Sequence, residues 1–222
     1  MTPTIAFDLD GTLLDTLGTI HHHLQVTLTS YGYQSLPLET TKELVGRGLG
    51  KLLADAVAVQ AGVKPEPIQI EEMIQSLVHS YQQDPLTNTS VYPGIKDLVW
   101  ELKELGYQLV VTTNKDQTIA QNLCNHFLPD VFSLVLGPEP PIAAKPNPAM
   151  IHAVQKQLGT GPQILVGDSE VDLETAKNCQ IDFIPVTWGF RIWDKHNLEG
   201  NIPVFTSNEL KKRIFYLISG KF

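Results

Sequence analysis

The sequence is poor in cysteine, in long apolar runs and in clustered positive charge. Its two cysteines, Cys124 and Cys179, match no CxxC or Cys-His spacing, so we expect free thiols rather than a disulfide bond or a zinc site. No stretch approaches the roughly 20 apolar residues that a membrane-spanning helix needs, and Met1 leads into a strand pattern without a signal peptide. We therefore expect a cytoplasmic protein.

Basic residues are outnumbered by acidic ones. The 222 residues include 16 Lys and Arg against 24 Asp and Glu, which gives a formal net charge of -8. Nonspecific binding to nucleic acid or to an anionic membrane depends on extended basic patches, which this composition disfavours. The hydrophobic share of 42% and the charged share of 18% are typical of a folded globular chain. We expect neither nucleic acid nor a membrane as a partner.

The pattern of apolar segments divides the chain into two parts. From Pro93 onward, strands that are apolar nearly throughout alternate with helices, which predicts a parallel sheet covered on both faces. Residues 4–7 form one more such strand, but a series of helical patterns separates it from the others. We predict an α/β fold with a Rossmann-like parallel-sheet core over residues 1–15 and 91–222, and an inserted all-helical cap domain over residues 16–90.

Local signals place the individual elements. Thr40 with Glu43 and Thr206 with Glu209 match capping boxes at helix starts, and "PVF" at 203–205 reads as a short strand. The expected helices cover 16–31, 49–60, 67–83, 94–105, 116–127, 147–158, 170–179 and 207–218. The expected strands of the core cover 4–7, 107–113, 131–136, 163–168 and 182–187.

Polar residues cluster where the predicted strands end. Ligands of parallel α/β sheets bind at the carboxyl ends of the strands, so we expect these clusters to converge in space. They are Asp8 with Asp10, Thr113 with Asn114 and Lys115, Lys145 in a Pro-rich loop, and Asp168 with Asp172.

The pair Asp8 and Asp10 indicates a cation site and a nucleophile. The period of two in an extended segment turns both carboxylates to one side, and Gly11 lets the chain turn away after them. Two adjacent buried carboxylates repel each other unless a cation lies between them, and a site of several carboxylates, with Asp168 as a third, suits Mg²⁺ better than zinc. One carboxylate can then attack phosphorus while the other transfers protons, with Lys145 holding the phosphoryl oxygens.

Four stretches occur in the order of a known set of motifs. "FDLDGTLLDT", "VVTTNK", "AAKPNP" and "VGDSEVD" resemble the four motifs of the haloacid dehalogenase superfamily, and the match is similar to its phosphoglycolate-phosphatase-like branch. The resemblance covers almost the whole chain and identifies the helical insert as the cap domain of that family. It implies that Asp8 is the nucleophile and that Asp10 is the general acid/base, with its backbone carbonyl bound to the metal. Thr113 and the Asn114 backbone would bind the phosphate, and Lys145 would neutralise negative charge. Asp168 would bind Mg²⁺, and Asp172 would bind it directly or through water.

Other candidate residues lie outside these motifs. The stretch "GRGLGK" at 46–51 fails the Walker spacing, but its glycines permit close approach to a ligand. Arg47 in this stretch could bind a substrate carboxylate or the distal part of a phosphate ester through its guanidinium group. The alternative is a solvent-exposed arginine in a hinge. Arg191, just beyond "TWGF", could reach either the metal-side rim or the cap. The histidines at 21–23 point about 100° apart on a helix and are expected on a partly buried helix face rather than around one ion.

The leading functional hypothesis is a magnesium-dependent phosphatase that hydrolyses a small phosphate monoester, with 2-phosphoglycolate as the best single candidate. Within the same chemistry, a phosphosugar mutase similar to beta-phosphoglucomutase and an inorganic pyrophosphatase remain alternatives. A signalling or regulatory module that accepts phosphate on aspartate is the alternative from another class. The expected partner is a small phosphorylated metabolite, and the chain is expected to be a monomer or a homodimer.

Overall fold

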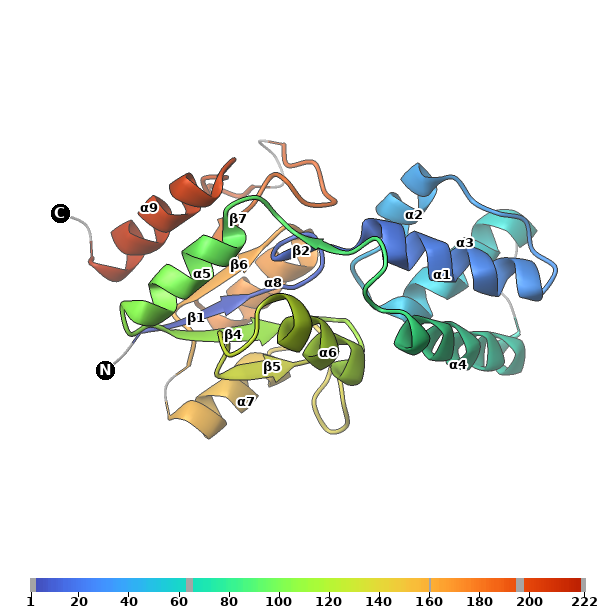
Figure 1. Cartoon of the computed structure of the whole chain (residues 1–222), viewed down its shortest axis with the longest axis horizontal. Helices are drawn as coiled ribbons and strands as arrows, with labels where there is room; N and C mark the ends of the chain where they lie inside the picture. The colour runs from blue at the N-terminus through green and yellow to red at the C-terminus, as the bar shows by residue number, and fades with distance from the viewer. Residues whose placement is uncertain (1–2, 63–65, 160, 195–197, 221–222) are drawn as a thin grey trace.

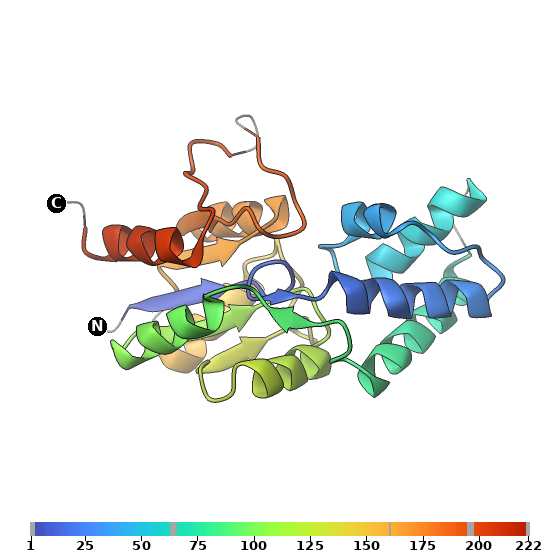
Figure 2. The same ribbon diagram turned by 45° about the horizontal axis from the view of Figure 1, so that its top comes forward.

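A parallel sheet with its helices and a separate group of helices make up the molecule. The computed structural model describes residues 3–62, 66–159, 161–194 and 198–220. The sheet lies on the left of Figure 1 and the helical insert on the right, and Figure 2 shows the same separation from a second direction. Among the described helices, none has the length and apolar character that crossing a membrane requires.

The central sheet has five strands, all parallel, in the order β5-β4-β1-β6-β7. The first strand lies in the middle of the sheet, and its side chains are buried on both faces, as its apolar sequence predicts. The carboxyl ends of the strands face the helical insert (Figure 1). The strands are β1 (Thr4–Phe7), β4 (Gln108–Thr112), β5 (Leu134–Leu136), β6 (Ile164–Gly167) and β7 (Asp182–Pro185).

Helices cover both faces of the sheet, as the apolar strands require. Alternation along β1 turns Ile5 and Phe7 to one face and Ala6 to the other, and each face has its own apolar core. The face of Ala6 packs against α7 (Ala149–Leu158) and α8 (Glu170–Cys179). The opposite face packs against α5 (Ile95–Glu104), α6 (Gln117–Phe127) and α9 (Ser207–Ile218).

Four described helices form the insert between β1 and β4. Leucines at helical spacing in α1, α3 and α4 pack together in an apolar cluster that continues into the face of the sheet with Ile5 and Phe7. These leucines include Leu24, Leu28, Leu53 and Leu77. Full burial of one such side chain stabilises the fold by about 1.5–3 kcal/mol. The helices are α1 (Leu17–Ser30), α2 (Leu38–Leu44), α3 (Leu49–Ala61) and α4 (Pro67–Gln83).

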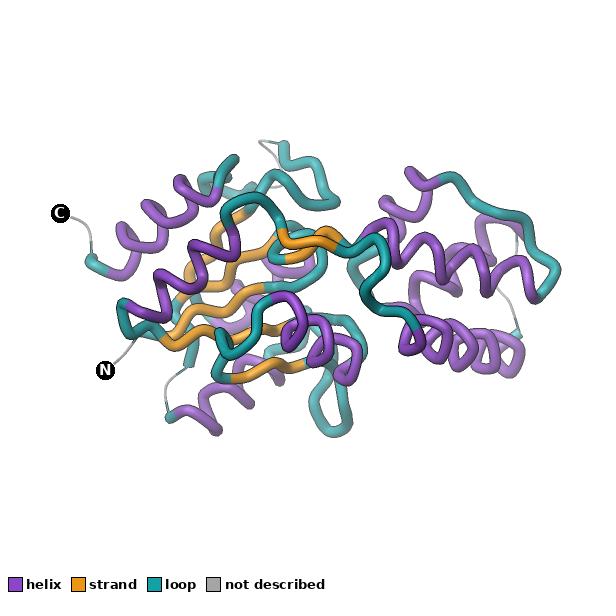
Figure 3. The backbone as a smooth tube through the Cα atoms, in the orientation of Figure 1, coloured by secondary structure: helices purple, strands orange, loops and turns teal. Residues whose placement is uncertain are grey.

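A short antiparallel ribbon joins the insert to the core. Strand β2 (Leu14–Asp15) pairs with β3 (Ser90–Val91), so the chain enters and leaves the insert at neighbouring points. Figure 3 shows this ribbon in orange between the two parts. The α/β fold with a parallel sheet and a helical insert is therefore confirmed, whereas the exact domain boundaries at residues 15/16 and 90/91 stay a prediction.

Two local predictions are wrong. Thr40 does not begin a helix, because α2 already starts at Leu38, where Pro37 has the fixed φ that favours the position before a first turn. The segment 203–205 is not a strand, because its contact with the sheet is the single bridge between Val186 and Val204. The second capping position is confirmed, since the Thr206 side chain accepts a hydrogen bond from the Glu209 amide at 3.2 Å.

Candidate active site

A cavity lies between the carboxyl edge of the sheet and the helical insert. Its floor carries the charged residues that follow the strands, including Asp8, Lys145 and Asp168. Its opposite wall is apolar and comes from the insert, with side chains such as Leu49 and Leu52.

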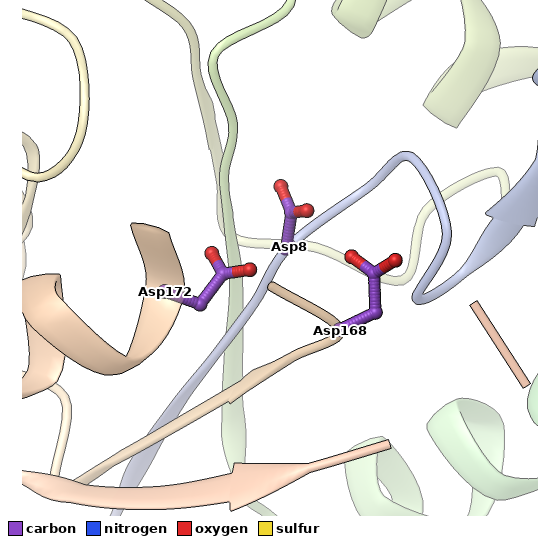
Figure 4. A group of neighbouring side chains, drawn as sticks. All are labelled: Asp8, Asp168 and Asp172. Carbon is purple, nitrogen blue, oxygen red and sulfur yellow. The ribbon is translucent and has the colours of Figure 1, made fainter. Parts of the chain in front are cut away.

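Three buried carboxylates meet at the floor of this cavity. Asp8 follows β1, Asp168 follows β6, and Asp172 lies in the first turn of α8. One oxygen of each lies within 4.8 Å of the others, and Figure 4 shows the three groups on the same side of the strand ends. The convergence predicted for these three residues is thus present.

The electrostatics of the three carboxylates favour a cation. The pKa of Asp8 is raised to about 7, chiefly by burial; the Lys145 charge lowers it and the Asp172 charge raises it. Burial, followed by the charges of Asp8 and Asp172, also raises the pKa of Asp168 well above its usual value. Ionisation of both Asp8 and Asp168 therefore needs more positive charge than Lys145 supplies. An all-oxygen donor set of this kind fits a hard divalent cation.

Lys145 forms the positive side of the cluster. Its Nζ lies 2.8 Å from Asp8 Oδ1 and 2.6 Å from Asp172 Oδ1, and its side chain is almost fully buried. Burial alone would lower the pKa of Lys145, but Asp172 and Asp8 raise it above the usual value, so the ammonium stays charged. The two ion pairs hold this charge beside the carboxylate of Asp8.

The Asn114 side chain fixes the loop that carries Lys145. Its Oδ1 accepts a hydrogen bond from the Lys145 amide at 2.7 Å, and its Nδ2 donates to the Lys145 carbonyl at 3.0 Å and to the Gly46 carbonyl at 3.2 Å. Sequence reasoning assigned a role to the backbone of Asn114 but none to this side chain. Thr113 is buried next to it in the wall of the same cavity.

Two glycines make room for Asp168. Gly11 has φ +83°, which an L side chain rarely adopts, and a Cβ there would collide with the Asp168 carboxylate. A Cβ on Gly189 would collide with the same carboxylate. Asp168 Oδ2 accepts a hydrogen bond from the Phe190 amide at 2.6 Å, which orients it. The turn expected at Gly11 is confirmed, and its structural reason is this close approach.

Asp172 both caps a helix and contacts the cluster. Ser169 Oγ lies 2.6 Å from Asp172 Oδ2, and the two residues form a reciprocal capping box at the start of α8. The other oxygen, Oδ1, accepts from Lys145. The capping interpretation of Asp172 is therefore confirmed, whereas its role as a metal ligand stays a prediction.

The carboxylate of Asp10 has partners of its own. Thr16 Oγ1 donates to Asp10 Oδ1 at 2.6 Å; Thr16 is the N-cap residue of α1, but its side chain makes no capping hydrogen bond there. Lys115 Nζ lies 3.1 Å from the same oxygen and 2.9 Å from the hydroxyl of Tyr81 in α4. Sequence reasoning placed Lys115 at this edge without a role, and its position directly after a strand end was the available signal. No sequence signal pointed to Tyr81, because it has the place of one more apolar residue in an amphipathic helix.

The two arginines lie at the seam between insert and core. Arg47 is exposed and lies beside a second depression, which it shares with Glu43, rather than among the residues that line the main cavity. Arg191 donates to the carbonyl oxygens of Lys42, at 2.8 Å, and Val45, at the end of α2. Arg191 Nε also lies 3.6 Å from Glu170 Oε2 at the start of α8, and Arg191 lines the main cavity together with Asp168. Arg191 therefore contacts the cap and also lies on the metal-side rim.

Comparisons with known proteins agree with the fold. The profile of the haloacid dehalogenase-like hydrolases matches residues 5–186, which is most of the chain. The chain belongs to the haloacid dehalogenase-like hydrolase family and is therefore a hydrolase. The resemblance seen in the four motifs is confirmed.

The chain is similar to individual relatives over most of its length. The chain is 35% identical over 192 residues to a phosphoglycolate phosphatase of Rhodobacter capsulatus, covering 86% of this chain and 87% of that protein. It is similar to a provisionally named phosphoglycolate phosphatase of Lactobacillus delbrueckii, with a TM-score of 0.88, 29% identity and coverage of 96% and 99%. A haloacid dehalogenase-like family protein of Streptococcus pneumoniae gives a TM-score of 0.82 at 25% identity, with coverage of 96% and 98%.

Proposed function

We propose that this protein hydrolyses a small phosphate monoester in a magnesium-dependent reaction through an aspartyl-phosphate on Asp8, and that 2-phosphoglycolate is its substrate. The observation that carries the proposal is the position of the Asp8 carboxylate, which lies 2.8 Å from the Lys145 ammonium and within a group of three carboxylates at the floor of a cavity. A carboxylate paired in this way can act as a nucleophile. The relatives named phosphoglycolate phosphatase support the choice of substrate.

The residues that would hold Mg²⁺ are Asp8, Asp168 and the Asp10 carbonyl, with Asp172 as a direct or water-mediated ligand. When bound, the ion supplies positive charge that offsets the carboxylates and the phosphoryl oxygens. Lys145, Thr113 and the Asn114 backbone hold the phosphoryl group. The apolar wall from the insert excludes bulk water from it.

The reaction proceeds in two steps. In the first, an oxygen of Asp8 attacks phosphorus, the bond between phosphorus and the alcohol oxygen breaks, and Asp10 gives its proton to the leaving alcohol. In the second, Asp10 takes a proton from a water molecule, the water oxygen attacks phosphorus, and the bond to Asp8 breaks. Phosphate leaves, and both carboxyl groups return to their starting states.

Arg47 is proposed as the partner of the substrate carboxylate. Because the side chain is exposed beside the second depression, it has to turn into the main cavity when substrate binds. The Arg47→Ala variant should show a raised KM for 2-phosphoglycolate but an unchanged KM for a phosphate ester without a carboxylate. Equal KM values for wild type and variant with 2-phosphoglycolate would exclude this role.

The test is phosphate release from a panel of small phosphate esters that includes 2-phosphoglycolate, with Mg²⁺ and with EDTA. We expect magnesium-dependent release that the Asp8→Asn variant loses, and 2-phosphoglycolate as the best substrate. Isomerised sugar phosphate without net release would indicate a mutase, and release only from inorganic diphosphate a pyrophosphatase. A stable phosphorylated protein without turnover would indicate a signalling module.

A further inference from the structure

Lys115 is a buried cation beside the carboxylate of Asp10. Its side chain is almost fully buried, and its Nζ lies 3.1 and 3.3 Å from the two oxygens of Asp10. The third neighbour of the ammonium is the Tyr81 hydroxyl at 2.9 Å. A lysine ammonium has three N–H donors, so these contacts use its full donor capacity.

Tyr81 reaches this lysine from the other part of the molecule. It lies in α4 of the helical insert and is completely buried, and its ring centroid is 4.3 Å from Lys115 Nζ, within the range of a cation–π contact. The His23 ring packs against it at 4.9 Å. His23 is itself held by Ser80 Oγ at 2.9 Å and by the Asp84 carbonyl at 2.8 Å. The insert therefore presents the Tyr81 hydroxyl in one fixed place.

A charged lysine at this position is not explained by stability. Removing an ammonium from water is unfavourable, and a well-packed apolar side chain of similar volume stabilises a buried site as well as an ion pair does. What the lysine provides and an apolar residue would not is a pair of donors directed at Asp10.

We propose that Lys115 is a positioning residue for Asp10, and that Tyr81 makes this positioning depend on the seating of the insert on the core. With the insert seated, the ammonium holds the Asp10 carboxylate in the orientation for proton transfer in both steps. When the insert moves away, Lys115 loses its Tyr81 contact and is less constrained. The inference rests on the proposed function, because it assigns a cause to the orientation of the acid/base residue.

Esters with different leaving groups separate positioning of Asp10 from general damage. Nitrophenolate leaves without accepting a proton, so formation of the aspartyl-phosphate from 4-nitrophenyl phosphate does not need Asp10 as an acid. Hydrolysis of the aspartyl-phosphate still needs Asp10 as a base. A variant in which only Asp10 is misplaced should therefore release one nitrophenol per active site quickly and then turn over slowly.

The experiment compares Lys115→Met and Tyr81→Phe with wild type in rapid-mixing assays. For Lys115→Met we expect a burst of one nitrophenol per active site, and a steady-state kcat about 100-fold below wild type with little change in KM. With an alkyl phosphate, the leaving alcohol needs the proton of Asp10, so the first step is slowed as well. We therefore expect no burst of alcohol release. Tyr81→Phe keeps the ring and loses the hydroxyl, so we expect the same pattern with kcat reduced about tenfold.

Two exposed residues of the same types supply matched controls. Lys177→Met and Tyr216→Phe change the same residue types at exposed positions and should leave both phases unchanged. A kcat within twofold of wild type in both test variants, or a folded Lys115→Met protein without a nitrophenol burst, would overturn the inference. If Lys115→Met does not fold, Tyr81→Phe decides. Failure of the proposed function is distinguishable, because wild type itself would then release no phosphate.

Discussion

Two of the buried carboxylates, Asp8 and Asp168, make the stability of the metal-free protein depend on pH. The pKa of Asp8 is raised from 3.8 to about 7, chiefly by burial. The folded chain therefore binds more protons at this residue than the unfolded chain does between about pH 4 and pH 7, so the free energy of unfolding falls as the pH rises through that window. The contribution is fully present below about pH 4 and is lost above about pH 7.

The size of this effect follows from the shift. Each pH unit between the folded and unfolded pKa values corresponds to about 1.4 kcal/mol, so ionising Asp8 at pH 8 destabilises the metal-free fold by about 4 kcal/mol. Asp168, whose pKa is raised in the same direction, adds to this. For a chain of this length, about 4 kcal/mol corresponds to a change in melting temperature of about 10 °C.

Thermal unfolding with EDTA and with Mg²⁺, at pH 5 and at pH 8, tests this reasoning. We expect a small stabilisation by Mg²⁺ at pH 5 and a large one at pH 8, because the ion replaces the protons that the carboxylates lose. Asp8→Asn should reduce the pH dependence in EDTA, whereas Asp182→Asn, at an exposed position, should not. Equal stabilisation by Mg²⁺ at the two pH values would refute the argument.

Three further substitutions test the contacts that support the site. Asn114→Ala removes both hydrogen bonds to the Lys145 backbone and should lower the free energy of unfolding by about 2 kcal/mol in urea titrations, together with kcat; unchanged values would contradict this. Arg191→Ala loses its contacts with the Lys42 and Val45 carbonyls and should raise KM severalfold, because the insert is then seated less firmly on the core; an unchanged KM would contradict this. Leu53→Ala should lower the free energy of unfolding by about 2–5 kcal/mol, because it leaves a cavity in the apolar cluster that the insert shares with Ile5 and Phe7 of β1; an unchanged value in urea titrations would contradict this.

The parts of the site that could be predicted from the sequence are those coded locally. Apolar strands that end in Asp8 and Asp168 have a recognisable pattern, and the rule that parallel strands present their carboxyl ends at one edge brings them together. Asp172 follows Asp168 by one helical turn, so its place was also defined by spacing. Long helices such as α4 were predicted with nearly correct ends because their periodicity extends over many residues.

The remaining features depend on contacts between distant segments. The meeting of Tyr81 with Lys115 requires the insert to be placed on the core, which no local pattern encodes. The clamp of Asn114 on Lys145 likewise joins two loops from different strands. The strands β2 and β3 have two residues each, too few for any periodicity. At Thr40 a capping pattern competed with a proline three residues earlier, and the proline determined the helix start.

The β2–β3 ribbon has a consequence for how such a protein can change over evolutionary time. Leu14 lies opposite Val91 and Asp15 opposite Ser90, so the two ends of the insert are adjacent in space. A segment with adjacent ends can grow, shrink or be exchanged for another without altering the distance that the flanking chain must span. Selection on which molecules enter the cavity can therefore act on the insert while the strand ends and their chemistry stay intact. The same adjacency makes residues 17–89 a natural unit for excision and head-to-tail cyclisation.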